Sequence, residues 1–261
     1  RNIMKLTCLG TASGIATKTR FHNMVLLESC GHGLLLDGGE PLSTLLIRHG
    51  TDLNEIDGMV ITHLHSDHAG ALPQLIQTMQ ISRRDKVFQV LMPSEGTHLY
   101  KDFLNMLYLF DSVLPFHLKI EGIQCGAEQE IGVFSIESIS NAHLKRLSEL
   151  AAEEGLLNQG QSYSIAIHCE GKRIVYSGDI KSVMELRPLL REETDLLILE
   201  MAHFMPDDFL MLLEDVCPRM TVFTHFHPDL DIEPEKKLHD LFHGSLPSKI
   251  IFANDGMELE I

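Results

Sequence analysis

Three histidines and one aspartate fall within six residues of this chain, in the stretch THLHSDHAG at residues 62–70. They directly follow the apolar run GMVIT, whose composition predicts a buried strand. Strand ends and the loops after them usually carry chemistry, because a rigid sheet positions side chains there without covering them. The fold must therefore bring this polar loop to an accessible edge of a sheet.

The loop offers the ligand types of a metal site. Zinc and similar ions bind imidazole nitrogen and carboxylate oxygen, and a catalytic site keeps one position open for water. In an extended segment residues 63 and 65 point the same way, so His63 and His65 can bind one ion. Asp67 and His68 follow the bend into the next helix and can reach a second ion. We therefore predict two divalent ions, zinc first, with manganese or iron as alternatives.

Further ligands are predicted at three other strand ends: His143 in SNAHLK, Asp179 in YSGD and His225 in FTHFHP. The assignment is His63, His65 and His143 for one ion, Asp67, His68 and His225 for the other, and Asp179 as the bridge. A lone histidine is more often a surface or packed core group, and Asp179 could equally cap a turn. The block HxHxDH therefore carries the assignment.

The strand and helix patterns occur in the same order in both halves of the chain. In the first half we predict strands at residues 5–10, 23–29, 32–39 and 58–62, with helices after Pro41 and at about 69–82. In the second half we predict strands at 133–140, 163–170, 172–179, 195–202, 219–225 and 249–255, with helices through 182–192, 207–216 and 234–242. Two such halves predict an α/β fold in four layers, an αββα sandwich. No linker or low-complexity tract divides the chain, so we expect one domain over residues 1–261.

Composition limits the partners and the compartment. The chain has 21 Lys and Arg against 37 Asp and Glu, and a net charge of -16 repels a long phosphate backbone unless a local basic patch intervenes. No apolar run approaches the roughly 18 residues of a membrane span, so we expect a cytoplasmic protein without membrane association. The five cysteines form no C-x-x-C pair, and we expect reduced core residues.

With these residues assigned, the chain resembles the metallo-β-lactamase superfamily over essentially its whole length. THLHSDHAG matches the defining block of that superfamily, LLLDGG resembles its first motif, and YSGD and FTH resemble its later ligand motifs. The resemblance implies the αββα fold and a di-zinc hydrolase. It also gives Asp37 the role of a buried carboxylate that orients the ligand loop.

Within the superfamily the chain is most similar to ribonuclease Z and its phosphodiesterase relatives. CLGTASGIATKTRFHN resembles their N-terminal basic loop, with Lys18 and Arg20 as candidate phosphate-binding residues, although a solvated turn is an equal alternative. LEMAH resembles the segment of their helper glutamate, and FANDGMELEI resembles their closing strand. No long Gly/Pro-rich arm for gripping tRNA is present. The resemblance favours a small phosphodiester or an RNA 3′ end as substrate.

The predicted mechanism uses a hydroxide that bridges two metal ions and attacks phosphorus. Asp67 would bind metal and also steer the proton of that hydroxide. Glu200 with His203 would protonate the leaving oxygen, although a surface pair is an equal alternative. A lactone or thioester hydrolase with the same metal site is the second hypothesis, and a di-iron redox protein or an inactive scaffold is third.

One further segment, HLYKDFLNMLYLF at residues 98–110, is apolar nearly all round. Leu99, Phe103, Met106 and Phe110 recur at helical spacing, which predicts a helix that is buried or meets a partner. We expect core packing, with a homodimer contact or a pocket wall as the alternative.

Overall fold

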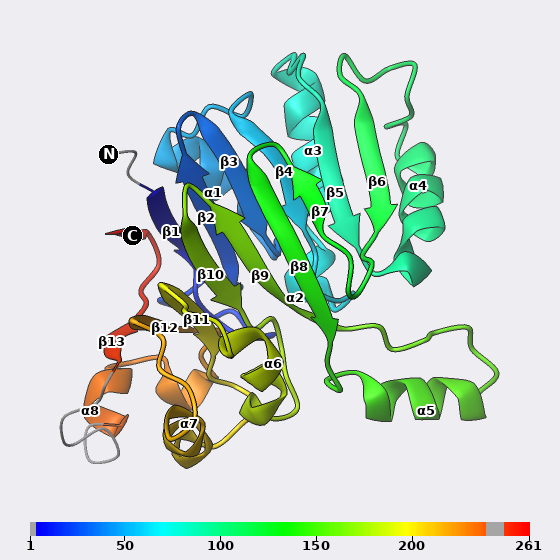
Figure 1. The fold of residues 1–261 in the computed structure, drawn as a ribbon. Helices are drawn as coiled ribbons and strands as arrows, with labels where there is room; N and C mark the ends of the chain where they lie inside the picture. The colour runs from blue at the N-terminus through cyan, green and yellow to red at the C-terminus, as the bar shows by residue number, and fades with distance from the viewer. Residues whose placement is uncertain (1–3, 239–247) are drawn as a thin grey trace.

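Two seven-stranded sheets pack against each other in the computed structural model, which describes residues 4–238 and 248–261 (Figure 1). The first sheet has the order β14 (Met257–Glu260), β1 (Met4–Gly10), β2 (Met24–Ser29), β3 (His32–Leu36), β4 (Ile56–Val60), β5 (Phe88–Met92), β6 (Leu118–Gly122). The second has the order β13 (Lys249–Phe252), β12 (Met220–Thr224), β11 (Leu196–Glu200), β10 (Lys172–Tyr176), β9 (Tyr163–Cys169), β8 (Phe134–Ser140), β7 (Gln129–Ile131).

The two sheets repeat one pattern of strand directions. In the first sheet β1, β2 and β3 are antiparallel neighbours, and β3 to β6 pair in parallel. In the second sheet β7 to β10 are antiparallel, and β10 to β13 pair in parallel. Because the carboxyl ends of parallel strands meet at the same edge, each sheet gathers its loops there.

Apolar side chains fill three layers. One buried cluster lies between the sheets, and it includes Val25 and Leu27 of β2. The neighbouring Met24 and Leu26 of the same strand point to the outer cluster, so β2 is apolar on both faces, as expected for a strand covered on both sides. The predicted αββα sandwich is therefore confirmed.

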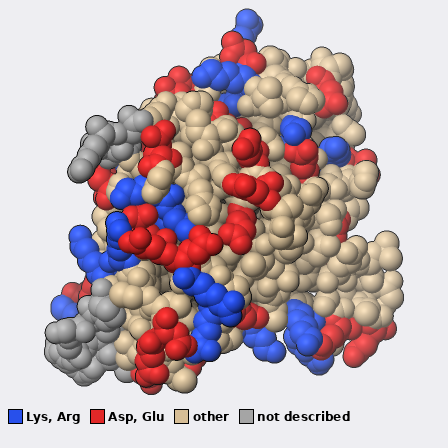
Figure 2. Space-filling view, in the orientation of Figure 1, with Lys and Arg blue, Asp and Glu red and all other residues tan. Residues whose placement is uncertain are grey.

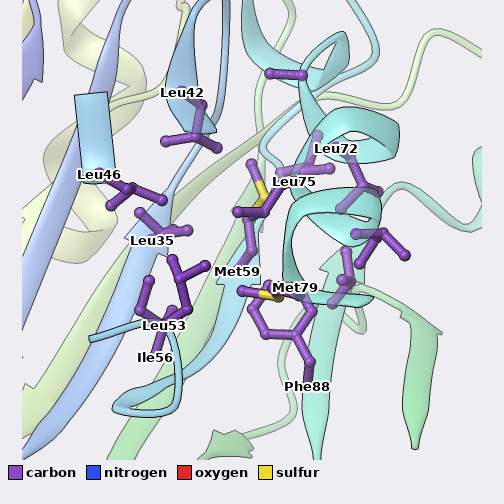
Figure 3. Close-up of a cluster of buried hydrophobic side chains, with 14 of the residues drawn as sticks. Leu35, Leu42, Leu46, Leu53, Ile56, Met59, Leu72, Leu75, Met79 and Phe88 are labelled. Carbon is purple, nitrogen blue, oxygen red and sulfur yellow. The ribbon is translucent and has the colours of Figure 1, made fainter. Parts of the chain in front are cut away.

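Helices cover the outer face of each sheet. α1 (Leu42–His49), α3 (Leu72–Ile81) and α4 (Thr97–Met106) pack on the first sheet, where leucines of α1 and α3 meet strand residues such as Leu35, Met59 and Phe88 (Figure 3). On the second sheet lie α6 (Arg187–Leu190), α7 (Pro206–Leu213) and α8 (Pro234–Leu238). Two helices lie closer to the site, the short α2 (Ser66–Ala69) and α5 (Lys145–Glu153), which projects away from the sheets (Figure 1).

The structure changes several of the predicted elements. β5, β6 and β7 were not predicted, and the helix predicted over 182–192 is a 3₁₀ turn at Val183–Leu186 followed by the single turn of α6. The helix predicted over 234–242 begins at Pro234, and its predicted residues after Leu238 lie outside the described part of the chain. The prediction that all cysteines are core residues is wrong for Cys30, Cys125 and Cys217, which are exposed.

The expected core packing of the 98–110 segment is also wrong. α4 ends at Met106, and it buries Leu104 while Leu99 is 69% exposed and Met106 is 66% exposed. The helix thus packs on the sheet through a narrow apolar stripe, and its other apolar side chains lie on the surface. None of the helices in the described residues is long and apolar enough to cross a membrane.

Acidic side chains dominate the charged groups of the face drawn in Figure 2, where they gather near its centre beside fewer basic ones. This distribution agrees with the net charge of -16. The view shows no broad basic surface on this face that would attract a long polyanion.

Candidate metal centre

The histidine loop leaves β4 at the edge where both sheets end. His63 and His68 are fully buried, and α2 begins directly after His65. Gly39 from the neighbouring loop lies against this segment so closely that a Cβ there would be 2.4 Å from the Asp67 carbonyl oxygen. A glycine at this position therefore lets the two loops approach and fixes the path of the ligand segment.

Four ligand atoms surround one point on the α2 side of the centre. The Nε2 atoms of His68 and His225 are 3.2 Å apart, and the Asp179 Oδ1 lies 3.3 Å from each. The Asp67 Oδ2 lies 3.2 Å from the His68 nitrogen and 3.4 Å from the His225 nitrogen. A tetrahedral zinc ion with bonds of about 2.0 Å needs ligand atoms about 3.3 Å apart, so the set fits zinc.

A second group lies on the other side of the same aspartate. The His65 Nδ1 is 3.1 Å from the His63 Nε2 and 3.3 Å from the His143 Nε2. The Asp179 Oδ2 lies 3.8 Å from the His63 nitrogen and 3.6 Å from the His143 nitrogen. The structure thus brings together both predicted ligand sets, which coincide with two of the groups of residues capable of holding an ion.

Asp179 joins the two groups through different oxygens. Its carboxylate is nearly fully buried, and its Oδ1 atom lies 3.3 Å from the Nε2 atoms of both His68 and His225. A buried carboxylate needs a cation beside it, which protonated imidazoles supply without metal and a metal ion would supply in their place. The donor set and its spacing fit a pair of divalent ions, with Asp179 belonging to both groups.

Asp37 fixes the position of the histidine loop through buried hydrogen bonds. Its fully buried carboxylate accepts hydrogen bonds from the Thr62 backbone N–H at 2.7 Å and from the Thr62 hydroxyl at 2.9 Å. It also lies 2.8 Å from the His68 Nδ1, which leaves the His68 Nε2 to face the centre. A carboxylate behind a ligand histidine fixes its tautomer and its ring orientation.

A chain of buried hydrogen bonds continues from Asp37 into the second sheet. The Tyr176 hydroxyl donates to Asp37 at 2.7 Å and accepts from the Asn23 amide at 2.6 Å. The Asn23 side-chain oxygen accepts in turn from the Thr224 hydroxyl at 2.7 Å, directly before His225. This series of hydrogen bonds therefore links the loop of His68 to the loop of His225 across the two sheets.

Sequence analysis missed Tyr176, Asn23 and Thr224 as parts of the site. Each is a polar residue at or beside the end of an apolar strand, and this pattern was the available signal. What the sequence could not give was the pairing between them, because the partners are 153 and 201 residues apart in the chain.

The backbone is left-handed at two functional positions. Asp37 has a φ of 55° and His225 has a φ of 55°, although neither is glycine. Such conformations cost about 1–2 kcal/mol per residue and persist where surrounding contacts fix them. Here the contacts are the carboxylate network of Asp37 and the close approach of His225 to the other ligands.

Glu200 and His203 lie at the rim of the centre. The Glu200 Oε1 is 3.0 Å from the His203 Nδ1, and the same carboxylate lies 3.7 Å from the His225 Nδ1. Glu200 is nearly fully buried, whereas the His203 side chain is 37% exposed. The His203 Nδ1 also lies 3.7 Å from Asp179, so this histidine stands between the ligands and solvent.

The two predicted phosphate-binding residues occupy different places. Lys18 is exposed, on a loop that follows Gly14, where a Cβ would lie 3.5 Å from the Asp67 carboxylate. Arg20 is buried, and its guanidinium donates to the Thr11 hydroxyl, the Ala253 carbonyl, the Asn254 side chain and the Asp231 carbonyl. The structure therefore does not bring Arg20 into the centre, and its contacts hold the loop against the ends of the second sheet.

Charge and burial separate the histidines into two classes. Burial lowers the pKa of His63 well below its ordinary value and lowers the pKa of His143 to about 4. Burial opposes protonation of His225 and His68 as well, but the Asp179 carboxylate outweighs it. The Asp179 carboxylate raises the pKa of His225 to about 9, and together with the Asp37 carboxylate it raises the pKa of His68. These last two histidines therefore carry protons at neutral pH that a metal ion would displace.

Comparison with known sequences gives a family and several partial matches. A family model described as Anti-Pycsar protein Apyc1 matches residues 4–229. Ribonuclease Z of Methanococcus maripaludis strain C5 is 35% identical over 105 residues, which are 40% of this chain and 33% of that protein. Ribonuclease Z of Haloarcula marismortui is 29% identical over 142 residues, 54% of this chain and 44% of that protein. The chain thus aligns with less than half the length of these two relatives.

Solved structures share the fold along nearly the whole chain. The metallo-β-lactamase fold protein YhfI from Bacillus subtilis matches with a TM-score of 0.74, 18% identity and full coverage of both chains. The short form of human tRNase Z matches with a TM-score of 0.74, 20% identity and 98% coverage of each chain. A diphosphatase of the PhnP family matches at 0.71, with 18% identity over 99% of this chain and 97% of its own. These likenesses confirm the predicted metallo-β-lactamase fold.

The hydrogen-bond chain predicts a specific defect for Tyr176→Phe. Loss of the hydroxyl leaves the buried Asn23 amide without its acceptor and removes one donor from Asp37, which costs about 1–3 kcal/mol of unfolding free energy. Because Asp37 orients His68, zinc affinity of the adjacent site should fall about 10- to 100-fold. Zinc titration against a chelating dye and thermal unfolding measure both effects. Tyr108→Phe, at an exposed tyrosine, is the control. Equal zinc affinity in both variants would show that the buried hydrogen bonds of Tyr176 do not support the metal site.

Metal binding should depend on pH in a direction set by His68 and His225. Their raised folded pKa values stabilise the protein without metal below pH 6.5, and this contribution is lost as pH rises through about 9 for His225. Zinc must displace those protons, so its affinity should rise between pH 6.5 and 9 with release of about two protons per chain near pH 7. Calorimetric titration of EDTA-treated protein in buffers of different ionisation enthalpy measures the release. An affinity independent of pH would contradict the assignment.

Proposed function

Because this chain belongs to the family of the anti-Pycsar protein Apyc1, within the metallo-β-lactamase superfamily, we propose that it is a metal-dependent phosphodiesterase. One observation carries the proposal: the two Asp179 oxygens face two separate sets of ligand atoms, with His203 at the rim of both. Partial likeness to ribonuclease Z favours phosphorus over carbon as the reacting atom.

The residues that would hold the metals are those whose ligand atoms converge. His63, His65 and His143 would hold one ion and Asp67, His68 and His225 the other, with Asp179 belonging to both groups. When bound, a pair of divalent ions would supply an activated water and neutralise charge on phosphoryl oxygens. The chain's own task is then to keep these ligands in place and to move protons at the rim.

His203 is suited to donate a proton to the leaving oxygen. Burial opposes its protonated form, but the Glu200 carboxylate outweighs burial and raises the pKa of His203 above its ordinary value. Glu200 holds the Nδ1 atom, which leaves the Nε2–H as the donor toward substrate. Hydrogen bonds from the backbone N–H groups of Ala202 and His203 fix the Glu200 carboxylate itself, so the ring is held in one orientation.

Lys18 is a candidate cation for a phosphate oxygen of the substrate. Its loop starts beside Asp67 at Gly14 and is exposed, so the side chain can turn toward a phosphate oxygen. Arg20 serves this loop indirectly, because its hydrogen bonds to Thr11 and Asn254 fix the end of the loop. With a net charge of -16, a small phosphodiester suits the protein better than a long RNA.

The proposed activity predicts turnover of bis(p-nitrophenyl) phosphate by the protein loaded with zinc or manganese. Asp67→Ala removes a ligand and should abolish turnover. His203→Gln should lower kcat about 10²- to 10⁴-fold because it removes the general acid. His203 also belongs to a third group that could hold an ion, with Asp179, Glu200 and His225, so metal analysis of this variant is part of the test, and unchanged metal content is the expected result. His98→Gln, on the exposed side of α4, is the matched control and should retain full activity.

The same assay discriminates the alternatives. A short RNA with a free 3′ end and small cyclic phosphodiesters, tested with the same variants, separate RNA processing from small-molecule hydrolysis. A protein that binds two ions and hydrolyses lactones or thioesters while leaving every phosphodiester intact would refute the proposal in favour of the second hypothesis.

We also propose a homodimer through the exposed face of α4. Leu99 and Met106 are more than half exposed there, and Phe103 is 43% exposed between them. A contiguous apolar row of this kind is typical of a protein–protein contact. Phe103→Glu should convert a dimer to a monomer in sedimentation analysis without loss of folded structure. A wild-type mass that stays monomeric at every concentration would remove the dimer.

A further inference from the structure

Glu185 caps the 3₁₀ turn Val183–Leu186 that follows the loop of Asp179. It is the third residue of that turn, and Ser182 directly precedes the turn. The Ser182 hydroxyl accepts a hydrogen bond from the Met184 backbone N–H at 3.3 Å, and the Glu185 Oε2 accepts from the Ser182 backbone N–H at 3.2 Å. This reciprocal arrangement is a capping box. The cap needs only Oε2, which leaves Oε1 for another partner.

The second oxygen of Glu185 binds a distant segment of the chain. Its Oε1 atom accepts a hydrogen bond from the Ala142 backbone N–H at 3.0 Å, across 43 residues of sequence. Its Oε2 atom accepts in addition from the Lys181 backbone N–H at 3.1 Å. Ala142 directly precedes His143, and Lys181 comes two positions after Asp179. One carboxylate thus connects the backbones of two loops that carry predicted ligands of the same ion.

A second series of hydrogen bonds joins the same two loops. The Asn141 side-chain oxygen accepts from the His143 backbone N–H at 3.1 Å, and the Asn141 amide donates to the Ser164 hydroxyl at 3.1 Å. The Ser164 hydroxyl donates in turn to the Ser177 carbonyl at 2.6 Å, two residues before Asp179. The loop of His143 is therefore bonded to the chain both before and after Asp179.

Apolar packing gives the loop of His143 little support. α5 begins at Lys145, two residues after His143, and it has no buried residue. Within residues 141–153, Leu144 alone is buried. Because a helix is usually fixed on a protein by its buried apolar face, α5 cannot set the position of the residues before it. The orientation of His143 then depends on the hydrogen bonds of its loop.

We propose that Glu185 is a positioning residue of the metal centre, which keeps His143 at bonding distance from the ion that it shares with Asp179. The inference rests on the proposed function, because it requires that both ligand sets bind metal. The set that includes His68 has its own support in Asp37. Loss of the Glu185 hydrogen bonds should therefore weaken the ion of His143 more than the other ion.

Glu185→Gln tests the proposal with little change of shape. An amide has one acceptor oxygen, so it can accept from one of the two loops but not from both. Zinc titration of the EDTA-treated protein, in competition with a chelating dye, should resolve two ions in the wild type. We expect the affinity of one of them to fall about 10- to 100-fold in the variant, as is usual when a group that orients a ligand is lost.

Three further variants separate positioning from folding and from charge. Ser182→Ala removes the hydroxyl of the capping box and leaves the three hydrogen bonds of the Glu185 carboxylate in place, so both zinc affinities should stay unchanged. Glu185→Asp keeps the charge but shortens the side chain by one methylene, and it should show the same selective loss as Glu185→Gln. In a His143→Ala background Glu185→Gln should cause no further loss, because two changes that act on one interaction are not additive.

Each outcome decides one of the two proposals. Unchanged affinities in Glu185→Gln and Glu185→Asp, equal losses for both ions, or a full further loss in the His143→Ala background would overturn the positioning role and leave the proposed function intact. The selective loss without turnover of bis(p-nitrophenyl) phosphate by the wild-type protein would keep the positioning role and refute the phosphodiesterase. Wild-type protein that binds fewer than two zinc ions would refute both.

Discussion

The buried carboxylate of Asp37 is the group on which the rest of the centre depends. A fully buried, ionised carboxylate costs several kcal/mol unless every oxygen is satisfied, and here its partners come from separate parts of the chain. Thr62 holds the start of the ligand loop, His68 lies past its bend, and Tyr176 comes from the other sheet. Satisfying one side chain therefore fixes a ligand, the loop that carries others and the position of the two sheets relative to each other.

The repeated strand pattern explains why so many ligands can meet at one edge. Parallel strands end on the same side, so the loops after β4, β10, β11 and β12 emerge together. Asp179 follows β10 and His225 follows β12, while the histidine loop follows β4 in the other sheet. The stacking of two sheets thus makes His68 and Asp179, more than 100 positions apart in the chain, neighbours at 3.3 Å.

Sequence alone predicted the parts of this arrangement that depend on local pattern. The block HxHxDH and the polar residues after apolar strands predicted the side chains that the structure brings together as candidate ligands, and alternating apolar runs predicted most of the strands. The interactions it missed, such as Tyr176 with Asn23, depend on pairing between distant segments and leave no local signature.

Arg20 shows the opposite error, because a basic residue in a loop resembles a phosphate ligand until the structure shows that its guanidinium donates to Thr11, Asn254 and two backbone carbonyls. α4 was expected in the core because its apolar residues surround the helix, and only packing decides which face is covered.

The balance of charge at the centre links this geometry to the size of the substrate. Asp37, Asp67, Asp179 and Glu200 contribute four negative charges in or against the ligand cluster, and two divalent ions would contribute four positive ones. With neutral histidines as ligands, the loaded centre is then close to neutral before substrate arrives. It can accept the single negative charge of one phosphodiester at close range, while the remaining acidic surface opposes every further phosphate. Each further phosphate of a longer chain would add repulsion from acidic residues, so the net charge agrees with the proposed substrate, one with a single phosphodiester.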